Sequence, residues 1–124
     1  MAVLAVSTEV EAAARVFYRI VRSNPPTVHD FLSAMARGRV PPDADAEDLR
    51  LLAGISVYRT EAQARRKARQ YPMLGAYVAE LSVPLERSVA IERTTPSPGH
   101  HTIWAAAADL LNWVVRVASI TQAS

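Results

Sequence analysis

A strand that leads directly into a helix constrains the fold of this chain more than any other feature. Residues 54–59 alternate apolar and polar side chains, which is typical of a half-buried strand. Thr60 stands three residues before a glutamine, the spacing of a capping box, and Pro72 follows a predicted helix over 60–71. Tyr58 and Thr60 therefore lie where a strand meets a helix N-terminus, a common place for an anion or a nucleotide.

The composition indicates a single domain that folds around its own core. The chain has 124 residues, 50% of them hydrophobic, so we expect one domain spanning 1–124. The chain has no cysteine, which excludes a disulfide framework and a thiolate metal site and fits a reducing, cytoplasmic compartment. No apolar run reaches the roughly 18–20 residues of a membrane span. No basic flank precedes the apolar start at residues 1–6, so we expect neither membrane contact nor a signal peptide.

The charges are nearly balanced in number but unevenly distributed. The formal net charge is +2, which is too small to indicate nucleic-acid binding by itself. Acidic residues cluster at 43–48 and basic residues at 59–69. The basic helix carries no interleaved aromatic residues of the kind that stack on RNA bases. A basic face of this kind is usually solvated, and an acidic partner is the alternative.

The N-terminal residues 8–22 support two interpretations. Apolar residues recur at helical spacing through the segment, which favours one amphipathic helix. The part from 16 to 21 is rich in β-branched and aromatic side chains, which favours a strand. We expect a short helix at 8–14 that continues into a strand at 15–22.

The other segments alternate between helix and strand patterns. Thr27 and Asp30 have capping-box spacing, and apolar residues at i, i+3, i+4 and i+7 follow up to Gly38, so we expect a helix over 28–37. Further helices are expected at 46–53 and 105–112, and strands at 76–83, 87–94, 101–104 and 113–120. Short connections between them predict an α+β fold, with a curved, split sheet of mixed or antiparallel strands and helices packed on it.

Arg19 and Tyr58 are the first candidate binding residues. Arg19 stands in a largely apolar run, where a charged side chain needs an anionic partner. One interpretation is that Arg19 holds a phosphate or carboxylate of a ligand. The other is that it forms a salt bridge with an acid of the 43–48 loop or lies exposed at the edge of the sheet. Tyr58 at the strand end is either a platform for an aromatic ring or a core tyrosine. Thr60 is most simply the cap of its helix.

His100 and His101 are candidates for acid–base chemistry. Adjacent residues of a strand face opposite ways, and no HxxxH or HExxH spacing is present, so we expect no metal site. One interpretation is that one of the two histidines acts as a general base or as a hydrogen-bond partner of a ligand. The other is that both are ordinary loop residues. Glu80 and Glu92 lie in predicted strands and are either solvated carboxylates or, if they face a pocket, candidate bases.

Three short motifs together give the chain a resemblance to a known superfamily. They are Phe17-Tyr-Arg-Ile-Val21, Asp30-Phe-Leu-Ser33, and Gly54-Ile-Ser-Val-Tyr-Arg-Thr60 followed by an alanine-rich helix. Over residues 16–92 the chain resembles the ADP-ribosyltransferase-like superfamily, and within it the small RES-type domains of bacterial toxins. The resemblance implies an α+β domain that binds NAD.

The resemblance also implies a role for individual residues. Arg19 matches the NAD-binding arginine, and Tyr58 matches the tyrosine that packs on the nicotinamide ring. The acidic residue of the family has no match in the helix that follows, because Glu61 lies too close to the strand end. We expect Glu92, ahead of Glu80, to take its place, with His100 as a second catalytic candidate and Thr60 beside the cofactor.

Two functions from different classes follow. The first is an NAD-dependent ADP-ribosyltransferase or NAD-cleaving enzyme, either a bacterial toxin or a small modifying enzyme, whose ligand is a small-molecule nucleotide. The second is a non-catalytic interaction protein that uses the basic helix 61–71 to bind an acidic or nucleic-acid partner. A protein partner or a homodimer is compatible with both.

Overall fold

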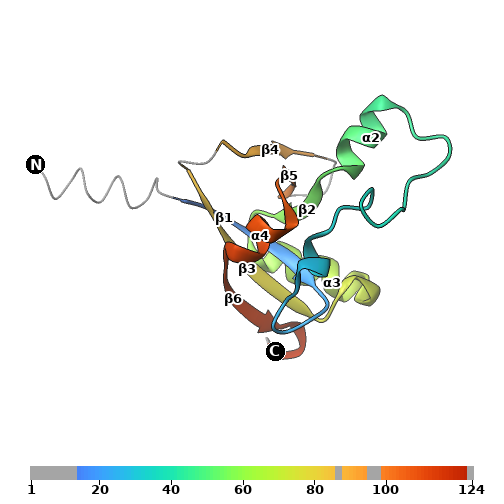
Figure 1. Ribbon diagram of the computed structural model, residues 1–124. Coiled ribbons are helices and arrows are strands. Elements are labelled where there is room, and N and C mark those ends of the chain that lie inside the picture. Colours follow the sequence, from blue (N-terminus) through green and yellow to red (C-terminus); the bar gives the residue numbers. More distant parts are fainter. Residues whose placement is uncertain (1–13, 86–87, 95–98, 123–124) are drawn as a thin grey trace, which may run out of the picture.

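Six strands form one antiparallel sheet in the computed structural model of the chain (Figure 1), which describes residues 14–85, 88–94 and 99–122. The strands are β1 (Ala14–Val21), β2 (Ile55–Tyr58), β3 (Tyr77–Pro84), β4 (Ala90–Arg93), β5 (His100–Trp104) and β6 (Val114–Ser119). They are ordered β4-β5-β2-β1-β3-β6, and every neighbouring pair is antiparallel. The predicted α+β domain is confirmed, and its sheet is antiparallel rather than mixed.

The sheet is split between β1 and β2. The strands β1 and β3 pair along their whole length, from Ala14 opposite Pro84 to Val21 opposite Tyr77. In contrast, β1 and β2 are joined by a single registered pair, Tyr18 with Tyr58. Beyond that pair the backbone groups of the two strands need other partners.

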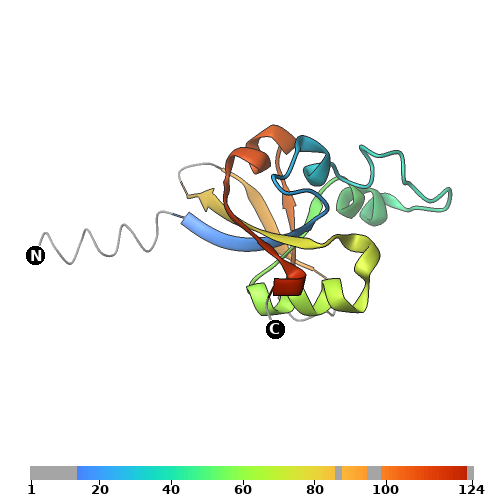
Figure 2. The same cartoon turned by 90° about the horizontal axis from the view of Figure 1, so that it is seen from below.

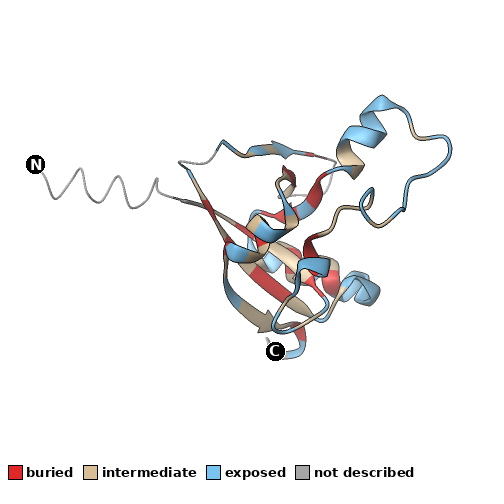
Figure 3. Cartoon of the chain, viewed as in Figure 1, coloured by how far each residue is buried: buried red, intermediate tan, exposed pale blue. Residues whose placement is uncertain are grey.

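Helices cover both faces of the sheet (Figure 2). One face is covered by α3 (Glu61–Gln70), and the other by α4 (Ala107–Asn112) and the 3₁₀ turn η1 (Val28–Phe31). The helix α2 (Ala46–Leu52) projects away from the sheet (Figure 1) and buries no residue, and the other 3₁₀ turns are η2 (Pro72–Leu74) and η3 (Ile120–Gln122). The larger core includes Phe17, Phe31, Leu81, Ile103 and Leu110, under η1 and α4. A smaller core lies under α3 on the other face, where Tyr58, Val78 and Ile120 pack against the small side chains of Ala64 and Ala68. Figure 3 shows the buried residues gathered in the strands.

The predicted helix over 28–37 is wrong. Only the 3₁₀ turn η1 forms, and residues 34–38 are a turn. The pattern required four apolar side chains on one packed face, but Val28 and Met35 are 39% and 38% exposed and only Phe31 is fully buried. A short helix depends on tertiary packing for its stability. Residues 32–37 have no core to cover, so the helix does not continue beyond η1.

The remaining predictions differ from the structure mainly at the ends of elements. The strand predicted at 87–94 is the shorter β4, the strand predicted at 101–104 begins one residue earlier in β5, and the helix predicted at 105–112 begins at Ala107. The strand predicted at 15–22 is confirmed as β1. The helix predicted at 8–14 lies outside the described residues except for its last residue, which begins β1. None of the helices in the described ranges is long and apolar enough to cross a membrane.

Candidate functional site

A cavity of about 430 Å³ lies beside the split in the sheet. Arg19 of β1, Tyr58 of β2 and His100 of β5 line it together. These three residues are far apart in the sequence, and the strand order brings them to one place because β1, β2 and β5 are neighbours. Three of the five predicted site residues therefore share one cavity.

Arg19 fills the gap where β1 and β2 separate. Its Nη1 donates to the carbonyl oxygen of Ser56 at 2.8 Å and its Nε donates to the carbonyl oxygen of Asp30 at 3.0 Å. The guanidinium thus replaces a strand-to-strand hydrogen bond on one side and holds the η1 turn on the other. Among the described residues its Nη2 has no hydrogen-bond partner, yet it is not sealed from solvent. Arg19 therefore keeps donors available to a ligand in the cavity.

The environment of Arg19 disfavours its charge without removing it. The pKa of Arg19 is lowered to about 10, first by burial and then by the nearby charge of Arg37, while Asp30 and Tyr58 act in the opposite direction. At pH 7 the side chain is still cationic. No described carboxylate lies within ion-pair distance of Arg19. The carboxylate of Asp30, which also lines the cavity, accepts the backbone N–H groups of Arg22 at 2.8 Å and Thr27 at 3.0 Å.

Positive charge dominates the cavity wall. Five cationic side chains line it against one carboxylate, that of Asp30, and the cations are Arg19, Arg22, Arg37, Arg39 and Lys67. None of the five forms an ion pair with a carboxylate of the described residues. Uncompensated cations around a concave surface attract anions, and they favour ligands that carry more than one negative charge.

A smaller hollow of about 220 Å³ adjoins the main cavity. The two share Arg19, Arg37, Arg39 and Ser56. The smaller hollow extends towards the residues around Leu52 that precede β2. The arginine side chains at the junction therefore face space on both sides.

Tyr58 belongs both to the core and to the cavity. Its side chain is 6% exposed and packs in the smaller core, and its ring meets that of His100 edge-on at 5.4 Å between centroids. Burial raises the pKa of Tyr58, partly opposed by the charge of Arg19. The hydroxyl group has no hydrogen-bond partner among the described residues and is not sealed from solvent. Tyr58 therefore presents its hydroxyl end, not an open ring face, to the cavity.

His100 is held in one orientation by Thr94. Its Nδ1 lies 3.0 Å from the carbonyl oxygen of Thr94 and 2.9 Å from the Thr94 hydroxyl, which in turn lies 2.8 Å from the hydroxyl of Thr102. Because a carbonyl oxygen only accepts, this contact assigns the proton of neutral His100 to Nδ1 and the lone pair to Nε2. His101 points to the other face of the sheet, where its ring lies 5.2 Å from that of Phe17.

We expect acidification to destabilise the domain through His100. Burial lowers the pKa of His100, as do the charges of Lys67 and His101, whereas the hydrogen bond to Thr94 raises it. The unfolded chain binds this proton near the ordinary value of about 6.5 and the folded chain only at lower pH, so stability falls as pH decreases below that value. Chemical denaturation between pH 7 and pH 5 should show a weaker pH dependence for His100→Gln, and NMR should place the midpoint of His100 below the ordinary value. Equal pH dependence of the variant and the wild type would contradict the prediction.

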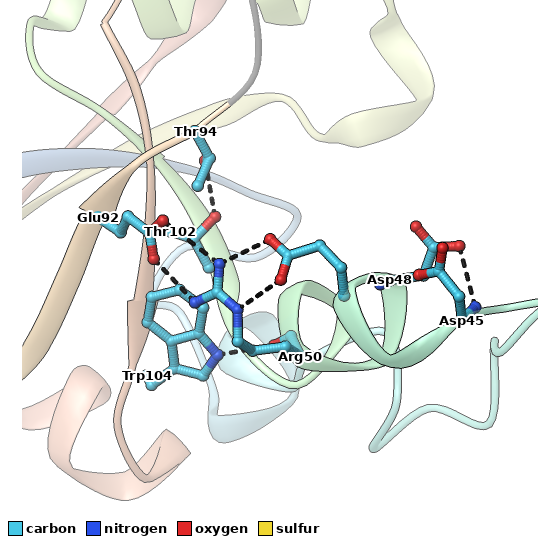
Figure 4. Close-up of polar contacts among 8 residues, drawn as sticks. Asp45, Asp48, Arg50, Glu92, Thr94, Thr102 and Trp104 are labelled. Carbon is cyan, nitrogen blue, oxygen red and sulfur yellow. Dashed lines mark hydrogen bonds and ion pairs between the residues drawn. The ribbon is translucent and has the colours of Figure 1, made fainter.

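Glu92 and Glu80 do not line the cavity. Glu92 is exposed on β4 and accepts hydrogen bonds from Arg50 of α2 at 2.8 and 3.3 Å, while the Arg50 guanidinium also lies over the ring of Trp104 (Figure 4). Glu80 bonds to Arg116 at 3.2 Å. The structure therefore does not bring the predicted catalytic glutamate to Arg19.

Thr60 also lies outside the cavity lining. Its hydroxyl accepts the backbone N–H of Gln63 at 3.2 Å, and the Gln63 side chain accepts the N–H of Thr60 at 3.1 Å, so the predicted capping box begins α3. Gly99 lies against Gln63 with φ +75°, and a Cβ there would overlap the Gln63 side chain. A glycine is therefore required where β5 begins beside this cap.

Sequence reasoning missed several cavity residues. Arg22, Arg37, Arg39 and Lys67 line the cavity, and Thr94 orients His100. The excess of arginine around 37–39 was visible in the sequence, but nothing there showed which cavity it would face. Within the described ranges, no group of three or more histidine, aspartate or glutamate side chains is placed to hold a metal ion.

Comparison with known proteins identifies no relative of the chain. No family model, no curated protein and no solved structure matches it.

Proposed function

We propose that the chain is an ADP-ribosyltransferase-like domain that binds NAD or a related nucleotide in the cavity of Arg19, Tyr58 and His100. The observation that carries the proposal is the half-buried Arg19 guanidinium, which has no carboxylate partner among the described residues and lines the cavity with four other cations. Such a charge is costly in a folded protein unless an anion joins it. The two phosphates of a dinucleotide supply that anion.

The shape of the site supports an extended ligand. The main cavity and the adjoining hollow, about 430 and 220 Å³, lie in the size range of small-molecule sites. Arg19, Arg37 and Arg39 belong to both. A pyrophosphate at this junction leaves room for one nucleoside on each side, and the planar guanidinium groups suit its oxygens.

The neutral residues of the cavity supply polar contacts. The Tyr58 hydroxyl is available for a hydrogen bond to a ribose or an amide, in place of the ring stacking that the resemblance implies. His100, neutral at pH 7 because burial lowers its pKa, suits the role of a base. In ADP-ribosyl transfer the bond between ribose and nicotinamide breaks and the electron pair stays with the nicotinamide. The incoming oxygen bonds to the ribose carbon, and its proton passes to His100.

Calorimetry with matched ligands tests the binding part of this proposal. We expect NAD and ADP-ribose to bind, and adenosine and nicotinamide, which lack phosphates, to bind far more weakly. Binding should weaken with added salt because several cations contact the phosphates. No heat of binding for NAD or ADP-ribose at millimolar concentration would contradict the proposal. Release of nicotinamide from NAD is measured separately, because it tests catalysis and not binding.

The alternative function, a basic helix that binds an acidic or nucleic-acid partner, has less support. Arg65 is folded back onto Glu61 at 2.7 Å and onto the carbonyl oxygen of Ser119 at 3.1 Å, so it belongs to the fold. Only Arg66 and Arg69 of the helix are exposed arginines. Two exposed arginines without interleaved aromatics are a poor surface for nucleic acid.

A further inference from the structure

Two exposed surfaces of opposite charge flank the cavity. The first, the acidic lobe, is residues 40–52. It carries four acids and one arginine, a net charge of −3, and the acids are Asp43, Asp45, Glu47 and Asp48. Its helix α2 has no buried residue, and Val40 and Leu49 are 37% and 38% exposed. The helix α2 therefore adds no buried side chain to the core, and Arg50 attaches it to the sheet through Glu92 and through the Trp104 indole N–H, which donates to the Arg50 carbonyl oxygen.

The second surface, the basic corner, is residues 66–74 at the end of α3 and in η2. It carries three bases and no acid, a net charge of +3, and the bases are Arg66, Lys67 and Arg69. None of the three forms an ion pair with a described carboxylate. Met73 is 74% exposed, Tyr71 42% and Leu74 39%, so apolar side chains stand exposed among the charges.

The two surfaces lie on the same side of the molecule. Figures 1 and 2 both show the lobe around α2 and the end of α3 on the right-hand side of the view. Arg39 at the base of the lobe and Lys67 and Leu74 of the corner line the same cavity. Because both surfaces face one way, a two-fold axis can place each on the other's counterpart at once.

We propose that the chain forms a two-fold dimer in which the acidic lobe of each copy docks on the basic corner of the other. One partner then covers both surfaces, with a net −3 against a net +3 in each of two identical contacts and with exposed apolar side chains on both sides. Within the lobe Glu47 already pairs with Arg50, and the net charge of −3 includes that arginine. An anionic membrane or a nucleic acid would cover the basic corner but would repel the acidic lobe. The lobe of the partner lies at the cavity rim, next to Lys67 and Leu74, so pairing also controls access to the cavity.

Charge exchange tests this dimer by sedimentation velocity on the full chain. We expect the wild type to sediment as a dimer at about 50 mM salt and to dissociate at about 500 mM. Arg66→Glu/Arg69→Glu should be monomeric at low salt, because both contacts then join two acidic surfaces. Asp43→Lys/Glu47→Lys should also be monomeric, because both contacts then join two basic surfaces. An equimolar mixture of the two variants should again sediment as a dimer, because each contact then joins opposite charges.

Matched variants separate this interface from loss of folding and from strand pairing. Arg66→Lys/Arg69→Lys keeps the charges and should dimerise like the wild type. Val115→Glu, at a 60% exposed position of the edge strand β6, should also leave the dimer intact. Circular dichroism confirms that each variant is folded.

Several outcomes would overturn the proposal. A wild-type chain that is monomeric at every concentration and salt would do so, including one that binds anionic vesicles or an acidic peptide instead. A dimer that Arg66→Glu/Arg69→Glu retains, or that Val115→Glu abolishes, would place the interface elsewhere. Failure of the mixture to re-form a dimer would exclude the reciprocal contact. None of these results depends on nucleotide binding, so the dimer and the proposed function stand or fall separately.

Discussion

Arg19→Lys is expected to weaken the binding of ADP-ribose by about 10- to 100-fold, because a charge-assisted hydrogen bond contributes about 1.5–3 kcal/mol. Lysine keeps the positive charge. Its single ammonium group cannot reach the carbonyl oxygens of Ser56 and Asp30 and face the cavity as well, as the planar guanidinium does. The phosphates therefore lose a preorganised donor, although the net charge of the cavity is unchanged. Calorimetry with ADP-ribose measures the loss directly.

Thr60→Ala is the control for this experiment. Thr60 caps the helix α3 but does not line the cavity, so its replacement should cost about 1 kcal/mol of stability through the lost cap and leave binding unchanged. Arg19→Lys with wild-type affinity would show that the ligand does not contact Arg19. Equal loss of affinity in both variants would show that affinity follows stability and not the guanidinium.

Tyr58→Ala is expected to destabilise the domain by about 3 kcal/mol or more, like other truncations of buried aromatic residues. The side chain is 6% exposed and packs in the core under α3 with Ala64, Ala68 and Val78. A loss of this size lowers the melting temperature by roughly 10 °C in a domain of this length. Of the two positions that the sequence left open for Tyr58, a platform for an aromatic ring or a core residue, this burial favours the core. Thermal unfolding followed by circular dichroism measures the change.

Tyr58→Phe separates the two roles of this residue. Phenylalanine fills the same core space, and the tyrosine hydroxyl has no partner among the described residues, so stability should stay close to that of the wild type. Affinity for ADP-ribose or NAD should decrease if the hydroxyl contacts the ligand. A melt of Tyr58→Ala close to that of the wild type would show that Tyr58 is not a core residue.

The site was predictable from sequence only where a residue broke a local pattern. Arg19 was a candidate because it interrupts an apolar strand, and Tyr58 because it ends the strand before a capped helix. Arg37 lies in a turn that sequence reasoning assigned to a helix, and Arg39 directly follows that turn, so their place in the cavity was not visible. Glu92 was chosen for its position on a strand, but its ion pair with Arg50 depends on how the acidic lobe folds against β4.

Local sequence determined the strands and the helix α3. Alternation of apolar and polar residues acts over a few neighbours, and Thr60 with Gln63 closes a cap within three residues, so β2, β3 and α3 follow from short-range chemistry. The local pattern of β1 also fitted a helix, and its pairing with β3 along the whole strand decided between the two.

Tertiary structure decided the segments that local chemistry left open. The helix pattern over 28–37 failed because only Phe31 finds a core to cover. The cavity exists because β1 and β2 separate after one registered pair, which places Arg19 between them and brings His100 of β5 beside Tyr58. Strand order and a split between strands depend on contacts far apart in the chain, and for that reason no local pattern contains them.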